Sequence, residues 1–364
     1  MREYLLTLLV AAAVTFLTTG GVRAVAIRVG ALAEVRDRDV HDTPIPRLGG
    51  VGMLLGLLGA VTVASGLPLL SRVFETDDVT AVLTAASVIC LIGVVDDVWG
   101  LDAITKLAGQ TLAGGLMALQ GIQLFWLPWP GQTVVLDSTT ATLVTVVVVV
   151  ATVNAVNFVD GLDGLAAGIV GIAASAFFVF SYQLSVQNSL ERALTPSLLS
   201  AALVGVCAGF LAHNFHPARV FMGDAGSMLI GLLLAAASIT LTGRVDYTSF
   251  SGIDIFPALL PTLLPFAVLA VPFLDLSLAV VRRARAGRSL FAADKQHLHH
   301  RLLEIGHSQR RAVLIMYGWT ALLAYGAVAV AVLPLPVATL GVALGLGGLV
   351  LLVRWPRSRS RVPR

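Results

Sequence analysis

The sequence predicts an all-α, polytopic integral membrane protein with about eleven transmembrane helices, each needing roughly 20 apolar residues. Of its 364 residues 57% are hydrophobic and only 12% are charged, whereas a soluble domain carries about 25% charged residues. The apolar residues also form continuous runs instead of the alternating pattern of a membrane β-barrel. This composition excludes a soluble globular enzyme and a receptor with a single membrane anchor.

The expected spans are the stretches without charge that are long enough to cross a bilayer. In chain order they are residues 4–22, 48–71, 79–95, 107–126, 138–159, 164–184, 196–213, 225–243, 255–274 (continuing past Asp275 to 281) and 312–353. The last stretch is long enough for two helices, and Pro334-Leu335-Pro336 supplies the turn between them. Residues 1–353 are therefore expected to form one transmembrane domain, followed by a basic tail at 354–364.

The positions of the basic residues predict the orientation of these spans. An odd number of spans places the two termini on opposite sides of the membrane, and cytoplasmic loops carry an excess of Lys and Arg. With the C-terminus in the cytoplasm, all but four of the 24 Lys and Arg residues lie on the cytoplasmic side; the four are Arg2, Arg72, Arg192 and Arg244. The N-terminus is then expected outside.

Several polar clusters interrupt the apolar runs, and this orientation places all of them on the cytoplasmic side. They are Asp96-Asp97 with Lys106, the segment 154–164, the segment 213–227 and the segment 294–301. Two adjacent carboxylates at the end of a span repel each other unless a cation joins them. Lys106 could be that cation or could contact a ligand phosphate, and a solvated helix end is the alternative interpretation.

The second and third clusters offer oxygen ligands of the kind that Mg²⁺ prefers. Asn157, Asp160 and Asp163 follow Asn154 at three-residue intervals, so on a helical turn they would share one face. Asp224 opens a span, where an aspartate could hold a metal while free N–H groups bind phosphate. A polar turn and an ordinary capped helix are the respective alternatives.

The last cluster contains three neighbouring histidines, His297, His299 and His300, in the most basic loop. Contact with an anionic ligand is favoured here over a Zn²⁺ site, since no cysteine lies nearby, and over a solvated loop.

Asp275 lies inside a predicted span and is either functional or a structural partner of Arg282. Cys90 and Cys207 are too few, and too deep in apolar runs, for a disulfide framework.

The order of these motifs resembles that of the polyprenyl-phosphate N-acetylhexosamine-1-phosphate transferases, from about residue 40 to residue 310. The matching segments are Pro44-x-Pro46-Arg47-x-Gly49-Gly50, Asp96-Asp97, Lys106-Leu-x-x-Gln110, Asn154-x-x-Asn157-x-x-Asp160-Gly-x-Asp163-Gly164, Phe221-Met-Gly-Asp224-x-Gly-Ser227 and His297-x-His299-His300. The His-x-His-His spacing is similar to the WecA/TagO type, whereas the related MraY type carries three consecutive histidines.

The resemblance implies transfer of GlcNAc-1-phosphate from UDP-GlcNAc to a polyprenyl phosphate (undecaprenyl or decaprenyl), with release of UMP. This reaction starts lipid-linked cell-envelope glycan synthesis at the cytoplasmic face of the bacterial cytoplasmic membrane. It implies a Mg²⁺ cofactor, for which Mn²⁺ could substitute, and membrane lipids but no nucleic acid as further partners; a homodimer is compatible with it.

The resemblance also implies roles for individual residues. The catalytic residues are Asp96, Asp97 and Lys106, and the metal ligands are Asp224 and Asn157. The substrate-binding residues are Asn154, Asn157, Asp160, Asp163, His297, His299, His300 and Arg301.

Other functions and mechanisms remain open at this point. A sister enzyme could use another UDP-HexNAc or UDP-MurNAc-pentapeptide. A secondary transporter would place its site near the bilayer midplane, often between repeats, and a non-catalytic lipid-binding protein would not need the metal-type residues. The acceptor phosphate is already mostly dianionic at pH 7, since its second pKa is near 6. Asp96 and Asp97 could therefore position the acceptor or the metal, act as a base, or serve as a covalent nucleophile.

Overall fold

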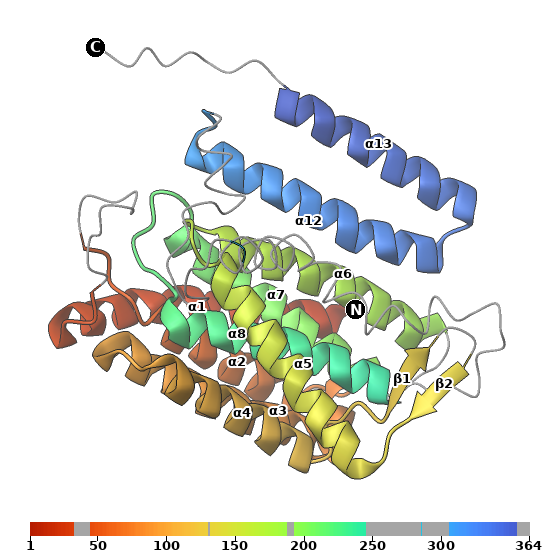
Figure 1. The fold of residues 1–364 in the computed structure, drawn as a ribbon, viewed down its shortest axis with the longest axis horizontal. Coiled ribbons are helices and arrows are strands. Elements are labelled where there is room, and N and C mark those ends of the chain that lie inside the picture. Colours follow the sequence, from red (N-terminus) through yellow and green to blue (C-terminus); the bar gives the residue numbers. More distant parts are fainter. Residues whose placement is uncertain (33–43, 130–131, 188–192, 245–284, 286–305, 355–364) are drawn as a thin grey trace.

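The computed structural model describes residues 1–32, 44–129, 132–187, 193–244, 285 and 306–354, which are almost entirely helical (Figure 1). The helices are α1 (Arg2–Val29), α2 (Gly49–Ser65), α3 (Asp78–Trp99), α4 (Ala103–Leu119), α5 (Ser138–Val159), α6 (Leu165–Gln187), α7 (Leu194–Asn214), α8 (Gly223–Arg244), α12 (Gln309–Val332) and α13 (Leu335–Arg354). A 3-10 helix, η1 (Leu70–Glu75), follows α2.

Among these helices, 8 are long and apolar enough to cross a membrane, and α2 is a shorter apolar helix. Each predicted span within the described ranges overlaps a helix, although the span predicted at 48–71 ends early, at Ser65. The break at Pro334 separates α12 from α13 as expected. The predicted span 255–274 lies outside the described residues. The fold is therefore that of a mostly helical, polytopic membrane protein.

The all-α prediction is wrong at one place, because a short hairpin joins α4 to α5. Strand β1 (Trp126–Trp129) pairs antiparallel with β2 (Gln132–Val135), with Trp126 opposite Val135. The predicted span 107–126 ends early, at Leu119, because Gly121 takes a φ of 99° that breaks the helix. Aromatic and β-branched residues then favour the extended backbone.

Helix α8 forms the centre of the bundle. It is buried along its whole apolar length and is surrounded by α2, α3, α5 and α7 (Figure 1). A helix that is hydrophobic all round requires such a position.

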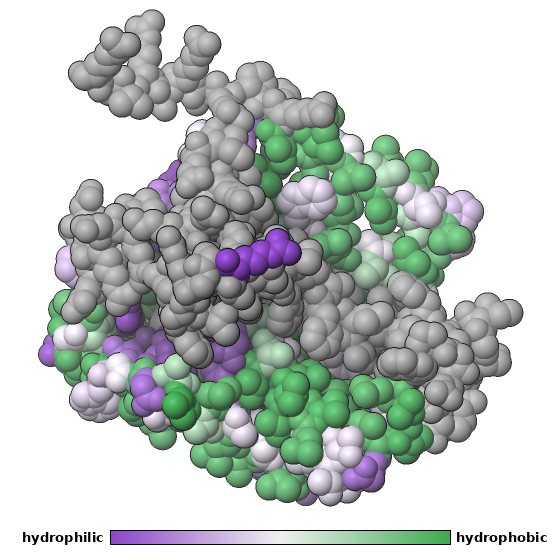
Figure 2. All heavy atoms as spheres, viewed as in Figure 1, coloured by the Kyte–Doolittle hydropathy of each residue, from purple (hydrophilic) through white to green (hydrophobic). Residues whose placement is uncertain are grey.

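Helix α13 lies at the periphery of the bundle. Among the described helices it packs substantially on α12 alone, and its leucines and valines are mostly exposed. Figure 2 shows how widely apolar atoms cover the visible surface of the described residues, as expected of a surface that faces lipid.

Glycines let α2 and α3 approach the first turn of α8 at backbone distance. A Cβ atom on Gly93 would lie 2.3 Å from Cα of Ala225, and one on Gly50 would lie 2.2 Å from the backbone nitrogen of Gly226. Small residues allow such close helix contacts in membrane proteins. The end of α3 and the start of α2 are thereby held against the residues that surround Asp224.

We expect Gly93→Ala to lower the melting temperature of the detergent-solubilised protein, because the new methyl group meets the backbone of α8. Overpacking of this kind typically costs about 1–3 kcal/mol, more than the roughly 0.5–1 kcal/mol that alanine gains in a helix. Gly115→Ala in α4 is the matched control, since its Cβ would meet nothing within 4 Å. Equal melting temperatures for the two variants would contradict the close α3–α8 contact.

Candidate active site

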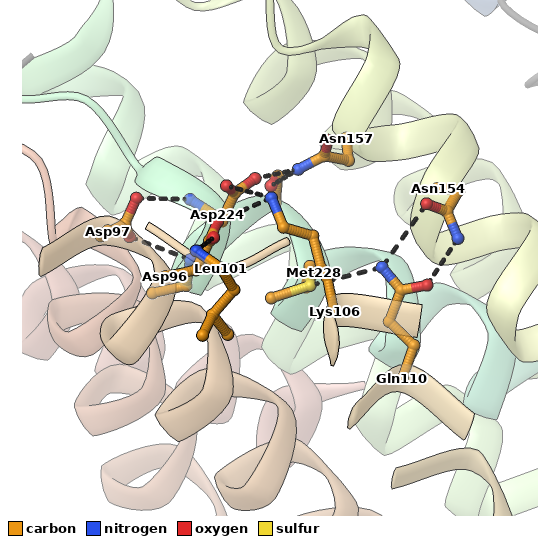
Figure 3. A network of polar contacts seen from close by, with 11 residues as sticks. Asp96, Asp97, Leu101, Lys106, Gln110, Asn154, Asn157, Asp224 and Met228 are labelled. Atoms are coloured by element: carbon orange, nitrogen blue, oxygen red, sulfur yellow. Dashed lines mark hydrogen bonds and ion pairs between the residues drawn. The ribbon is translucent and has the colours of Figure 1, made fainter. Parts of the chain in front are cut away.

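Four helix ends meet at one end of the bundle and bring together residues that are far apart in the sequence. The end of α3 contributes Asp96 and Asp97, the start of α4 Lys106, the end of α5 Asn157 and the start of α8 Asp224 (Figure 3). We call these five residues the Asp–Lys cluster. The sequence prediction that three of the polar segments lie at the same end of the fold is thus confirmed.

Lys106 bridges two carboxylates from different helices. Its Nζ atom lies 2.7 Å from Oδ2 of Asp96 and 2.9 Å from Oδ2 of Asp224. The short turn between α3 and α4 makes this possible: α3 stops at Gly100, whose φ is 73°, and Asp102 caps α4 by accepting hydrogen bonds from the first turn. Lys106 then lies one turn into α4 and faces back towards α3.

The two adjacent aspartates have different partners. Asp96 accepts a hydrogen bond from the backbone of Leu101 through Oδ1 (2.7 Å) and directs Oδ2 to Lys106. Asp97 accepts hydrogen bonds from the backbone N–H groups of Asp224 (2.9 Å) and Ala225 (3.1 Å). Two of the N–H groups at the start of α8, which the sequence suggested for phosphate binding, are therefore already bound by Asp97.

The packing around Asp97 leaves no space for a side chain at the first residue of α8. A Cβ atom on Gly223 would lie 2.2 Å from Oδ2 of Asp97, and Gly223 also has a φ of 68°, which favours glycine. Asp97 consequently acts as a cap for α8 and positions the adjacent Asp224.

Asn157 completes the surroundings of Asp224. Its Nδ2 atom donates hydrogen bonds to Oδ1 of Asp224 and, at 2.9 Å, to Oγ of Ser227. Asp224 therefore receives a neutral donor on one oxygen and the Lys106 ammonium on the other. Asp224 and Asn157, the two predicted metal ligands, are in direct contact.

Asp160 lies just beyond α5 and is half-buried. Burial raises the pKa of Asp160 to about 7, and the negative charges of Asp224 and Asp97 act in the same direction. A cation bound near these carboxylates would lower that pKa again. In the described part of the chain no group of three or more His, Cys, Asp and Glu residues is arranged to hold a metal, so an ion here would depend on fewer carboxylates together with amide and substrate oxygens.

Asn154 and Asp163, both predicted to bind substrate, have hydrogen-bond partners within the protein. Asn154 donates to Oε1 of the buried Gln110 (2.6 Å), and Gln110 also contacts Sδ of Met228, which links α4, α5 and α8. The buried Asp163 accepts hydrogen bonds from Nδ1 of His216 (2.8 Å) and from the backbone of Ala218 (3.0 Å). Asp163 thereby fixes the connection between α7 and α8.

The expectation of one shared helical face for Asn157, Asp160 and Asp163 is wrong. Helix α5 ends at Val159, and the following residues turn sharply up to Gly164, whose φ is 75°. After this turn, the Asp163 carboxylate accepts hydrogen bonds from His216 and Ala218 in the connection between α7 and α8. The histidines His297, His299 and His300, with Arg301 and Asp275, lie outside the described residues.

One basic residue near the site had no role assigned from sequence, although its motif was recognised. Arg47 precedes α2, and the backbone on both sides of it is hydrogen-bonded to the segment before α8: Pro46 O accepts from Phe221 N (2.8 Å), and Gly49 N donates to Phe221 O (3.1 Å). The signal in the sequence was an arginine between a proline and two glycines.

A bundle of long apolar helices that ends in a Lys-bridged carboxylate cluster defines the class: a polytopic membrane protein whose polar site lies at the helix ends. The chain belongs to glycosyl transferase family 4, whose family model matches residues 79–242. That range contains the complete Asp–Lys cluster.

Known transferases are similar to this protein over most of the chain. A decaprenyl-phosphate N-acetylglucosaminephosphotransferase of Mycobacterium tuberculosis is 50% identical over 332 residues, which cover 90% of this chain and 82% of the relative. A phospho-N-acetylmuramoyl-pentapeptide-transferase of Desulforudis audaxviator is 33% identical, covering 78% of this chain and 83% of the relative. An undecaprenyl-phosphate alpha-N-acetylglucosaminyl 1-phosphate transferase of Yersinia pestis is 29% identical, covering 83% and 77%. The family resemblance noted in the sequence is confirmed.

The different partners of the two aspartates lead to a prediction about stability. Asp97→Asn should lower the melting temperature more than Asp96→Asn, because one amide oxygen cannot replace both carboxylate oxygens at the start of α8. Loss of a helix cap typically costs about 0.5–2 kcal/mol. In Asp96→Asn the amide oxygen can still accept the hydrogen bond from the backbone N–H of Leu101. This variant loses only the negative charge that faces Lys106. Thermal unfolding of both variants in one detergent checks this, and the reverse order would contradict the capping role.

Proposed function

We propose that this protein transfers N-acetylglucosamine 1-phosphate from UDP-GlcNAc to a polyprenyl phosphate, decaprenyl or undecaprenyl, and releases UMP. The observation that carries the proposal is 50% identity to a decaprenyl-phosphate N-acetylglucosaminephosphotransferase over 90% of the chain. The Asp–Lys cluster supports it independently, because it offers both carboxylates and a cation at one end of the apolar bundle, where a lipid phosphate and a water-soluble nucleotide can meet.

Charge neutralisation is the main chemical task of this reaction. An oxygen of the acceptor phosphate attacks the β-phosphorus of the UDP-sugar, so two anions must approach each other. Preorganised positive charge stabilises the transition state of such a transfer. Lys106, which its two carboxylate partners hold in place, is suited to contact the diphosphate of the donor.

The donor set at the cluster fits Mg²⁺, with Mn²⁺ as a substitute. Asp96 and Asp224 direct carboxylate oxygens at one common cation, Lys106. Rotation of the Asn157 amide, whose Nδ2 now contacts Asp224, would present its oxygen to an ion bound by Asp224. These oxygen ligands are the kind that hard cations prefer. When bound, the ion would neutralise and polarise the diphosphate. Asp96, Asp224 and Asn157 would hold it, and Lys106 would then be free to direct its ammonium group at the substrate.

The proposal is tested by measuring UMP release from purified protein in detergent with Mg²⁺ and a polyprenyl phosphate. We expect UDP-GlcNAc to be used and UDP-MurNAc-pentapeptide not to be, in line with the His-x-His-His spacing at His297, His299 and His300. Efficient use of the muramyl donor would contradict the donor assignment. No UMP release from any UDP-HexNAc would contradict the proposed function itself.

A pair of aspartate variants provides the control for that assay. Asp224→Ala should reduce the rate by about 10²–10³, the typical cost of losing one electrostatic element of an active site. Asp137→Asn should leave the rate unchanged, because Asp137 is an exposed cap at the opposite end of α5 and asparagine caps helices equally well. A full rate and an unchanged Mg²⁺ optimum in Asp224→Ala would remove Asp224 from the site.

We favour direct displacement over a covalent intermediate. Both oxygens of Asp97 accept backbone hydrogen bonds, and Asp96 is bound by Leu101 and Lys106, so each carboxylate already has a positioning task. A covalent route requires exchange of label between UMP and UDP-GlcNAc without any polyprenyl phosphate. We expect no such exchange, and its detection at a rate close to turnover would establish the covalent route.

We further propose about eleven spans within one catalytic domain, residues 1–353, in the bacterial cytoplasmic membrane, with the site on the cytoplasmic face. The uneven distribution of Lys and Arg supports this orientation. Single cysteines in a Cys90→Ser, Cys207→Ser background test it. A membrane-impermeant maleimide should label Ser138→Cys, far from the site, in intact cells, but Ala103→Cys, at the start of α4, only after permeabilisation. The opposite labelling pattern would invert the topology.

A further inference from the structure

The segment that carries Arg47 is attached to the start of α8 by its backbone. In addition to the two hydrogen bonds to Phe221, the N–H of Gly50 donates to the carbonyl oxygen of Met222 at 2.9 Å. A Cβ on Gly49 would lie 2.8 Å from the carbonyl oxygen of Phe221, so neither glycine position accepts a larger residue without movement. Arg47 is therefore anchored a few residues from Asp224, through the backbone.

The residue after Arg47 has a strained backbone. Leu48 has a φ of 76°, and within the described ranges no other residue except glycine has a positive φ. This left-handed conformation is unfavourable for a residue with a side chain. Leu48 is nevertheless buried, in a small apolar cluster with Ala26 and Ala31. Strain that the surroundings maintain in this way is concentrated at functional sites, and here it holds the turn that carries Arg47.

The Arg47 side chain is half-buried, and the N–H groups of its guanidinium are available to a ligand. Among the described residues its guanidinium has no hydrogen-bond or ion-pair partner, whereas its backbone N–H donates to Ala31. Its positive charge lies close enough to act on the carboxylates of Asp97 and Asp160. Lys106 contacts Asp96 and Asp224 directly, so the two cations act on different carboxylates of the site.

The charge balance of the site requires further positive charge before phosphate groups can enter it. Four aspartates and a single lysine surround the place where two phosphate-bearing substrates must meet, so Lys106 alone leaves a surplus of negative charge. A guanidinium is planar, remains charged at any relevant pH and can donate two parallel hydrogen bonds to a phosphate. A partly buried, unpaired arginine at the edge of such a site has the chemistry for that contact.

We propose that Arg47 binds a phosphate group of the reactants, as a second cation of the site beside Lys106. The inference rests on the proposed function. The phosphate can belong to the diphosphate of the nucleotide sugar or to the monophosphate of the lipid acceptor. Both offer the same oxygen acceptors to the guanidinium, and the kinetic arms of the experiment distinguish them.

The test compares Arg47→Gln and Arg47→Lys with the wild type. The concentrations of UDP-GlcNAc and of polyprenyl phosphate are varied separately, each with the other at saturation. Because a hydrogen bond to a charged group contributes about 1.5–3 kcal/mol, Arg47→Gln should lose about 10- to 100-fold in kcat/KM. Arg47→Lys, which keeps the charge but not the planar fork, should lose less. A raised KM for UDP-GlcNAc assigns the diphosphate, and a raised KM for the lipid assigns the monophosphate.

Arg28→Gln is the matched control, because Arg28 is exposed in the last turn of α1 and its loss changes the net charge by the same amount. It should keep both KM values. Melting temperatures close to that of the wild type would show that the Arg47 variants are folded. If the wild type is active and both Arg47 variants keep kcat and both KM values within about twofold, Arg47 does not bind substrate, and the proposed function stands.

A binding measurement keeps the inference testable even if the wild type shows no turnover. Inorganic pyrophosphate and inorganic phosphate should each be added to the wild type and to Arg47→Gln while thermal unfolding is followed. At least one of them should raise the melting temperature of the wild type and have a smaller effect on the variant, since a ligand of the native state stabilises it by mass action. Equal shifts in both proteins, or none in either, would overturn the role of Arg47 independently of catalysis.

Discussion

The carboxylate of Asp97 accepts the backbone N–H groups at the start of α8, and the arrangement of the site depends on this contact. A helix N-terminus presents unsatisfied donors and a partial positive charge, and here it is buried among other helices. Asp97 satisfies these donors from α3, while Gly93 brings α3 close enough to reach them. The same contact fixes Asp224, because Asp224 supplies one of the two N–H groups. The capping interaction and the position of the candidate metal ligand are thus one structural feature.

Around this contact the site concentrates negative charge at the end of an apolar bundle, and cations keep it stable. Four carboxylates close together would repel one another in a medium of low dielectric. Lys106 neutralises two of them by direct contact, and Arg47 acts on the other two from a distance. Substrate phosphates and a hard cation would change this balance together. A site of this kind is suited to a reaction in which anions enter and leave.

The apolar bundle itself explains why the charged residues of the site lie at its end. Helix α8 is buried along its length, and the helices around it are apolar on their outer surface (Figure 2), so the bundle interior offers few partners for charges. Among the uncharged polar groups deeper in it, hydroxyl groups bond to backbone oxygens, as Ser200 does to Pro196, and Gln110 pairs with Asn154. The turns after α3 and α5 are short and depend on Gly100 and Gly164. Short turns keep the functional side chains close to the helix ends.

The sequence by itself determined the helical membrane class, most helix positions, the family and the residue types of the site. These properties depend on composition, on the length of apolar runs and on motifs that are local in the chain. Only the tertiary structure decided which partner each polar side chain takes. It distinguished Asp97, which caps α8, from Asp96, which pairs with Lys106, and it joined Asp163 to the connection between α7 and α8. It also placed the β1–β2 hairpin. The partners of Asp97 and Asp163 lie more than 50 positions away in the chain, at Asp224 and His216, and a residue pattern along the chain cannot specify such contacts.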